Sequence, residues 1–89
     1  MDFVHKNNKI SVQEDAKEVA FLSYKLEGNV LTVEHTVVSP QMEGQGIGNQ
    51  LVKQIVEYAR DQKLKIIPQC PFANRVIQET PEYQDVLKN

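Results

Sequence analysis

Residues 30–62 are VLTVEHTVVSPQMEGQGIGNQLVKQIVEYARDQ, and the spacing of apolar residues changes once within them. Up to Val38 the spacing is two, which indicates a β-strand with two distinct faces. We expect one face to hold Leu31, Val33, His35 and Val37, and the other to hold Val30, Thr32, Glu34, Thr36 and Val38. From Ile47 the spacing becomes helical, which predicts a helix over residues 47–62 with a stripe of Ile47, Leu51, Val52, Ile55, Val56 and Ala59.

Three further strands are predicted before this stretch, at residues 3–6, 10–12 and 19–26. The first two flank Asn7, Asn8 and Lys9, and asparagine tolerates the positive φ of a tight hairpin turn. Residues 14–17 form a polar turn, and residues 27–29 form a second tight turn. The strand at 19–26 alternates less strictly, so we expect it to be covered on both faces.

After the helix, residues 64–67 predict a short strand that Pro68 ends. Pro71 suits the first position of a helix through about Glu79, and residues 82–87 add a last turn. A strand, helix and strand of this spacing form a right-handed βαβ unit with parallel strands. The predicted fold class is therefore α/β: a mixed (α+β) sheet of antiparallel N-terminal strands followed by a β-α-β-α unit.

Size and composition limit the function classes. The chain has 89 residues, which fits a single domain over 1–89. Ten basic and 12 acidic side chains give a net charge of −2, without the basic surplus of a nucleic-acid-binding protein. No apolar run is long enough to span a membrane, and the N-terminus lacks a signal-peptide core, so a cytoplasmic location is expected. One cysteine and two histidines disfavour a closed metal site.

Three of the four glycines, Gly44, Gly46 and Gly48, lie between the clearest strand and the clearest helix. Glycines let a backbone approach a ligand, and a helix start offers unpaired N–H groups to an anion. The pattern therefore suits a phosphate or pyrophosphate, and a ligand-free turn is an equally good interpretation of the glycines alone. The spacing is neither that of a dinucleotide-binding Rossmann loop nor that of a Walker A loop.

The corner at residues 68–72 follows the strand expected to pair with residues 30–38. Ligands bind beyond the carboxyl ends of such strands, and a cysteine near a helix N-terminus can be nucleophilic. Cys70 is thus a candidate nucleophile, and the alternative is a buried structural cysteine. Asn74 and Arg75 could bond a ligand from the next helix turn, although for Arg75 an exposed helix face is the favoured interpretation.

Glu34 and His35 are adjacent near the end of the predicted strand, where either could act as a general base. The alternative is a solvent-facing Glu34 and a core-facing His35 with a hydrogen-bond partner. We expect His5 to be a surface residue, and spacing assigns no role to the tyrosines.

Residues 37–52, with EGQGIG at 43–48, resemble the acetyl-coenzyme A (acetyl-CoA) loop of the GNAT superfamily of N-acetyltransferases. That loop is Gln/Arg-x-x-Gly-x-Gly/Ala, which Gly46 and Gly48 match and from which Glu43 departs. The chain is most similar to the small, minimal GNAT-like (YjdJ-like) branch. The marks of that branch are Glu34-His35-Thr36, the glycine loop, residues 65–73 (KIIPQCPFA) and the ending PEYQDV at 81–86.

The resemblance implies a way of binding acetyl-CoA. Loop amides would hold the pyrophosphate, the strand end would pair with the pantetheine arm, and Cys70 would lie near the thioester. Asn74 matches a position that often contacts pantetheine. The implied cofactor-binding residues are Val37, Val38, Glu43, Gly44, Gln45, Gly46, Ile47, Gly48, Asn49, Pro71, Phe72 and Asn74.

The implied activity is transfer of an acetyl group from acetyl-CoA to an unidentified amine. The amine would attack the thioester directly, with Glu34 or His35 as base, or would receive the acetyl group by way of Cys70. Larger GNAT enzymes carry helices and strands around the acceptor that this chain lacks, so a partner could complete the acceptor site. A non-catalytic CoA-binding or protein-interaction module is the alternative, and a ligand-free domain is the third interpretation. The chain would be a monomer or, through an exposed sheet edge, a homodimer.

Overall fold

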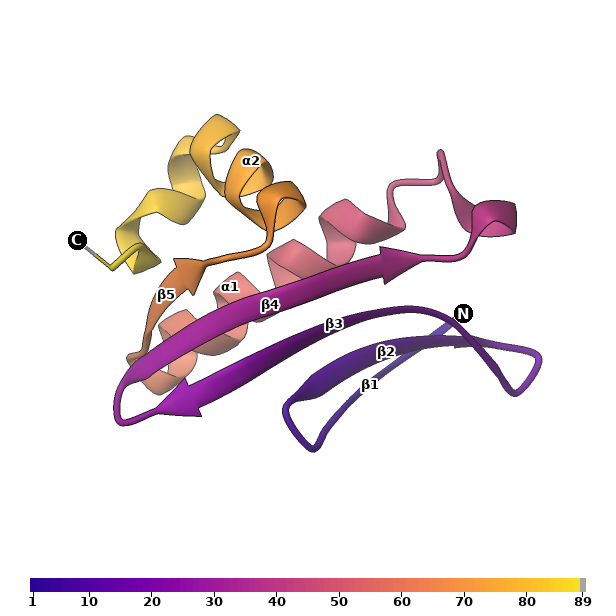
Figure 1. Ribbon diagram of the computed structural model, residues 1–89, viewed down its shortest axis with the longest axis horizontal. Coiled ribbons are helices and arrows are strands. Elements are labelled where there is room, and N and C mark those ends of the chain that lie inside the picture. Colours follow the sequence, from indigo (N-terminus) through magenta and orange to yellow (C-terminus); the bar gives the residue numbers. More distant parts are fainter. Residues whose placement is uncertain (89) are drawn as a thin grey trace.

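The computed structural model describes residues 1–88, and its strands form one sheet in chain order (Figure 1). The strands are β1 (Asp2–Lys6), β2 (Lys9–Glu14), β3 (Lys17–Glu27), β4 (Val30–Val38) and β5 (Lys65–Pro68). The helices are α1 (Ile47–Gln62) and α2 (Pro71–Glu79), with 3-10 turns η1 (Pro40–Met42) and η2 (Pro81–Val86). β1 to β4 pair antiparallel and β4 pairs with β5 in parallel, which confirms the predicted mixed sheet.

Two-residue turns join the first three strands. Asn7 and Asn8 have φ of 55° and 61°, as the asparagines predicted. Asp15 and Ala16, with φ of 50° and 65°, make a second such turn in the polar link between β2 and β3. Positive φ at both central residues matches the twist of the flanking strands, so these turns set the register of the hairpins.

The two faces of β3 differ in burial. Ala20, Leu22 and Tyr24 are buried, whereas the alternate residues Phe21 and Ser23 are half-buried. The expected coverage of both faces of this strand is therefore only partial, with one face buried and the other half-buried. β2 and β3 also shift register between Val12 and Gln13, which leaves Val19 without a partner in β2.

A bulge in β4 changes which residues face the core. Tyr24 of β3 pairs with Val33, and its neighbour Ser23 pairs with His35, so Glu34 has no partner. Such an extra residue moves every later side chain to the other face. Leu31 and Val33 are buried as predicted, but His35 and Val37 are exposed. The predicted two-face assignment is thus wrong after Glu34, because the bulge turns Thr36 toward the core face.

The apolar stripe of α1 lies against the sheet, and every predicted member of it is buried. α1 contacts β3, β4 and β5, and Figure 1 shows it lying behind β4. Ala73 and Ile77 of α2 and Val86 of η2 join the same core. Within residues 1–88, no helix is long and apolar enough to cross a membrane.

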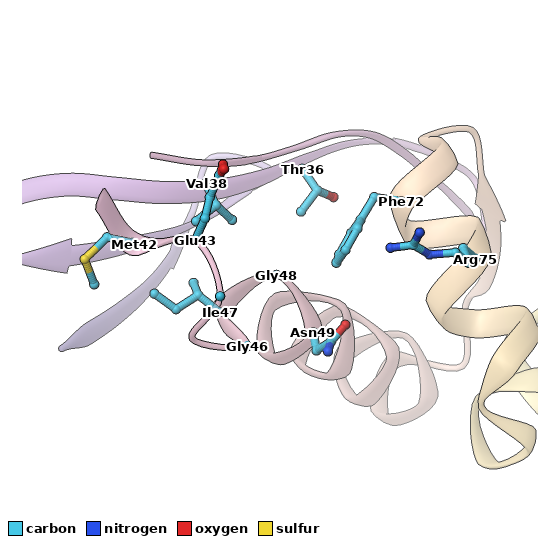
Figure 2. A pocket seen from close by; sticks show the side chains of 11 residues that line it. Thr36, Val38, Met42, Glu43, Gly46, Ile47, Gly48, Asn49, Phe72 and Arg75 are labelled. Atoms are coloured by element: carbon cyan, nitrogen blue, oxygen red, sulfur yellow. The ribbon is translucent and has the colours of Figure 1, made fainter. Parts of the chain in front are cut away.

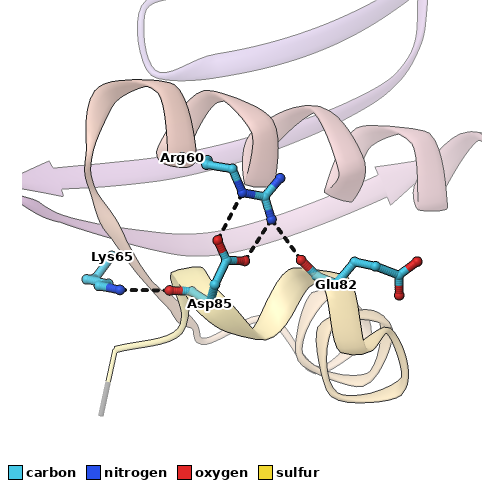
Figure 3. Close-up of polar contacts among 4 residues, drawn as sticks. All are labelled: Arg60, Lys65, Glu82 and Asp85. Atoms are coloured by element: carbon cyan, nitrogen blue, oxygen red, sulfur yellow. Dashed lines mark hydrogen bonds and ion pairs between the residues drawn. The ribbon is translucent and has the colours of Figure 1, made fainter.

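Arg60 of α1 holds the C-terminal turn in place (Figure 3). Its guanidinium donates to both carboxylate oxygens of Asp85, at 3.0 and 2.7 Å, and to the Glu82 carbonyl at 2.7 Å. Lys65 of β5 donates to the Asp85 carbonyl at 2.7 Å. The hydrogen bond from Arg60 lowers the pKa of Asp85. Since these groups are exposed, the network fixes the position of η2 but adds little to the stability of the fold.

An aromatic cluster fastens β1 to the core. The His5 ring and the Tyr24 hydroxyl are hydrogen-bonded at 2.7 Å, and the Tyr58 ring of α1 stands edge-on to His5 with centroids 4.5 Å apart. Burial, together with Tyr58, raises the pKa of Tyr24 to about 12. His5 is exposed, as expected. Its ring is nevertheless not free, because it connects β1 to Tyr24 of β3 and Tyr58 of α1.

Adjacent isoleucines of β5 provide a matched test of the core. Ile66 is fully buried and Ile67 is 39% exposed. We expect Ile66→Ala to lower the free energy of unfolding by about 2–4 kcal/mol, because it leaves a cavity. Ile67→Ala should cost less than about 1 kcal/mol. Urea unfolding of both variants measures this, and equal losses would contradict the described burial.

Although His5 as a whole is exposed, partial burial of its ring against Tyr24 and Tyr58 lowers the pKa of His5 below its ordinary value of 6.5. A lowered pKa in the folded state means that neutral His5 favours folding. Its contribution is therefore present above pH 6.5 and is lost as the pH falls through the folded-state pKa. Between pH 8 and pH 5, wild type should lose more stability than His5→Gln does. Urea midpoints at the two pH values measure the difference, with His35→Gln as the control that keeps the His5 cluster. Equal losses in wild type and His5→Gln would refute the role of the cluster.

Candidate functional site

A cavity of about 430 Å³ opens where the end of β4 meets the starts of α1 and α2 (Figure 2). The loop between β4 and α1 forms one wall, and Phe72 with Arg75 forms the opposite wall. The lining residues are Thr36, Val38, Met42, Glu43, Gly44, Gly46, Ile47, Gly48, Asn49, Phe72 and Arg75.

The glycine loop gives this cavity a backbone suited to an anion. Gly44 and Gly46 have φ of 83° and 77°, values that other residues adopt only with strain. Gly46 caps α1, and the first helical hydrogen bond runs from the Gln50 N–H to the Gly46 carbonyl at 3.1 Å. The amides of residues 47–49 therefore have no partner within the helix, and all three residues line the cavity. They carry the partial positive charge of a helix start.

Glycine is required at position 48 because of packing. Its backbone conformation does not require it, since its φ is not in the left-handed region. A Cβ atom at this position would lie 2.8 Å from Cζ of the Phe72 ring. The missing side chain lets the ring rest on the first turn of α1. Contact between these two residues therefore sets the distance between α1 and α2 beside the cavity.

The Val33 carbonyl ends the pairing of β4 with β5. It accepts the N–H groups of both Gln69 and Cys70, each at 3.0 Å. β5 then turns into α2, with Cys70 as its N-cap and Pro71 at its first position, as predicted. Because the bulge has turned Thr36 to the same side, its Oγ1 lies 3.6 Å from Sγ of Cys70.

Hydrogen bonds polarise the Cys70 thiol. Burial by itself would raise the pKa, but the Ala73 amide, the Thr36 hydroxyl and further backbone groups of Phe72 and Thr36 lower it below the usual value. The side chain is free of any disulfide and is buried. It does not line the cavity itself and lies behind Thr36. Next to the cavity wall, the protein thus holds a thiol whose pKa is lowered by its hydrogen bonds.

The structure brings most of the predicted loop residues together at the cavity. Val38, Glu43, Gly44, Gly46, Ile47, Gly48, Asn49 and Phe72 line it. Four other predicted residues do not line it, namely Val37, Gln45, Pro71 and Asn74. Val37 is 48% exposed on the other face of the sheet because of the bulge. The Asn74 amide oxygen instead accepts from Gln78 on the helix surface, at 3.4 Å.

The two candidate bases lie at the bulge. Glu34 is the unpaired, half-buried residue, and His35 is exposed on the face opposite the core. The alternative of a core-facing His35 is therefore wrong. His35 directly precedes Thr36 and Glu34 lies two residues before it, on the strand that separates from β5, but neither residue lines the cavity.

Sequence reasoning missed two lining residues, Thr36 and Met42, and favoured a non-binding interpretation for a third, Arg75. Thr36 was assigned to the face away from Val33, and only the bulge brings it to the core face beside Cys70. Arg75 was expected on an exposed helix face, and it is exposed, but it also lines the cavity. Its spacing of three residues from Phe72 places both on one side of α2 and was a usable signal.

A second cavity, of about 410 Å³, lies between the β2–β3 turn and η1. Glu14, Asp15 and Glu18 line it together with Lys17. Among the described residues there is no group of three or more His, Cys, Asp or Glu side chains that could hold a metal ion.

Comparisons with known proteins agree with this geometry. Residues 8–86 match the family model of the GCN5-related N-acetyl-transferases. An NMR solution structure of a GCN5-like protein from Staphylococcus aureus is similar over 99% of this chain and 88% of that one. The identity is 33% and the TM-score is 0.82. The comparison with curated proteins gave no match.

Two more distant structures share the fold. The ribosomal-protein-S18-alanine N-acetyltransferase of Escherichia coli matches over 86% of this chain and 50% of its own, with 13% identity and a TM-score of 0.66. N-acetylglutamate synthase of Neisseria gonorrhoeae, in complex with CoA and N-acetyl-glutamate, matches over 66% of this chain and 15% of its own. That match has 19% identity and a TM-score of 0.59. The chain is therefore a member of the GCN5-related N-acetyltransferase family.

Proposed function

We propose that the chain binds acetyl-CoA in the 430 Å³ cavity and transfers its acetyl group to an amine. The observation that carries the proposal is the position of the glycine loop. Its positive-φ glycines and the free amides of α1 lie beyond the end of β4, and they line one cavity with Thr36 and Val38, the part of β4 that has separated from β5. Backbone N–H groups at a helix start suit a pyrophosphate, and the gap between separating strands suits a narrow amide-containing arm. The CoA bound to N-acetylglutamate synthase supports the same ligand class.

The residues present fit this ligand in shape. Gly44 and Gly46 have nothing within 4 Å of the positions where Cβ atoms would be, so the loop surface is open. Val38 and Thr36 continue the wall from the loop toward Cys70. A phosphate group at the loop would thus leave the thioester end directed toward the Thr36–Cys70 pair.

Direct transfer needs an acceptor amine with a free electron pair. The amine attacks the thioester carbonyl carbon, the bond to the CoA sulfur breaks, and the amine loses a proton. Glu34 would take that proton, because it lies at the bulge two residues before Thr36, whereas His35 is exposed on the opposite face of the sheet. The loop would supply positioning, and correct positioning lowers the barrier without new chemistry.

Cys70 offers a two-step route. Its thiolate would attack the thioester carbonyl carbon, and the bond between that carbon and the CoA sulfur would break as CoA leaves. The amine would then attack acetyl-Cys70, which returns Cys70 to the thiolate and passes the amine's proton to the base. Two observations favour this route: the lowered pKa of the thiol and its contact with Thr36 on the cavity wall.

One sample tests the proposal. The purified chain is titrated calorimetrically with acetyl-CoA, and the same material is examined by mass spectrometry with and without an amine panel. Saturable heat and acetylated amine support the transferase. Saturable heat without acetylated amine would indicate the non-catalytic CoA-binding module. No heat at high ligand concentration would overturn the proposal.

Gly46 and Gly28 form a matched pair for the loop. Both have positive φ, 77° and 60°, and neither has an atom within 4 Å of a built Cβ. Alanine therefore brings similar backbone strain, about 1–2 kcal/mol, to each site. Only Gly46→Ala should disturb the loop, and we expect it to weaken acetyl-CoA binding about 10-fold, because strain of this size shifts the loop amides away from the bound phosphate. Calorimetry on both variants measures this, and equal affinities would argue against loop binding.

Thr36 and Cys70 test the two-step route. Cys70→Ala should abolish the added acetyl mass on the protein and most of the transfer. Thr36→Val removes one hydrogen bond to the thiol, so the pKa of Cys70 should rise. The pH dependence of the transfer rate should then shift to higher pH. Thr32→Val, in the same strand and away from Cys70, is the control and should leave the profile unchanged. Full transfer activity in Cys70→Ala would exclude the two-step route in favour of direct transfer.

A further inference from the structure

Two opposite charges face each other across the cavity. Arg75 is the one basic residue among its lining residues, and Glu43 is the one acidic residue. Figure 2 shows the Arg75 side chain reaching from α2 toward Phe72, with Glu43 on the far side beside Val38. The cavity therefore has no net formal charge, although the proposed ligand carries several phosphate charges.

Arg75 is held in position without using its hydrogen-bond donors. Its guanidinium carbon lies 5.6 Å from the centroid of the Phe72 ring, and within residues 1–88 it forms no salt bridge. Stacking on a ring orients a guanidinium while leaving its N–H groups free. Arg60 makes the contrast clear, because its N–H groups are bonded to Asp85 and Glu82.

Glu43 places a negative charge on the loop wall of the cavity. A carboxylate in the loop repels a phosphate group bound there, and the neutral amides of α1 offset only part of that repulsion. No other lining side chain can supply a positive charge.

We propose that Arg75, stacked on Phe72, recognises a phosphate group of CoA and offsets the charge of Glu43. A planar guanidinium binds a phosphate through two parallel hydrogen bonds, which a neutral side chain cannot replace. CoA offers two kinds of phosphate, the diphosphate bridge and the 3′-phosphate. This inference rests on the proposed function and makes Arg75 a specificity-determining residue of the same site.

The test compares CoA affinities of wild type, Arg75→Gln, Glu43→Gln and Lys6→Gln by calorimetry. Arg75→Gln should weaken binding about 10-fold, and Glu43→Gln should tighten it about 3-fold, because they remove opposite charges. Lys6 is an exposed residue of β1 that does not line the cavity, so Lys6→Gln should bind as wild type does. Both changes in affinity should shrink when salt is raised from about 0.05 to 0.5 M.

Dephospho-CoA identifies the phosphate group. If Arg75 binds the 3′-phosphate, Arg75→Gln loses affinity for CoA alone; if it binds the diphosphate, the variant loses affinity for both ligands. Either result supports the proposal. Unchanged affinity in Arg75→Gln, or a loss that salt does not reduce, would overturn it, since a purely packing role on Phe72 would not respond to salt. Absence of binding by wild type would instead overturn the proposed function.

Discussion

The Val33 carbonyl is the point on which the rest of the site depends. By accepting the amides of Gln69 and Cys70, each at 3.0 Å, it ends the parallel ladder after four residue pairs. β4 continues beyond it while β5 turns away into α2. One backbone group therefore closes the sheet on one side and opens the cavity on the other. Since each hydrogen bond is made by backbone, side-chain substitutions alter the contents of the cavity more easily than its shape.

The bulge at Glu34 acts immediately after that point. Thr36 would face away from the core without it, and Cys70 would lose the hydroxyl at 3.6 Å. The same extra residue leaves His35 and Val37 exposed on the opposite face. Core packing beside Val33 and the polar contact at Cys70 thus follow from a single irregularity in the ladder. Glu34 and His35 also owe their position, where the strands separate, to this irregularity.

Local signals in the sequence were sufficient for most of the fold. Asn7-Asn8 predicted a turn, Pro71 predicted the start of α2, and the apolar stripe gave the bounds of α1 correctly. Each of these features is determined by residues within its own segment, so the local sequence is enough to predict it. The bulge depends instead on how β3 and β4 pair, so strict alternation along β4 gave wrong faces for His35 and Thr36. Likewise, the role of Gly48 appears only when Phe72, 24 positions later, packs on it.

The central claim is that the cavity between the glycine loop, Thr36 and α2 binds acetyl-CoA. Titration of the ¹⁵N-labelled chain with acetyl-CoA, followed by amide chemical shifts, tests it most directly. The account predicts saturable shifts confined to residues 36–49 and 70–75, with the largest at Gly44, Gly46 and Gly48. Shifts centred on the β2–β3 turn beside the second cavity, or no saturable shifts, would contradict it.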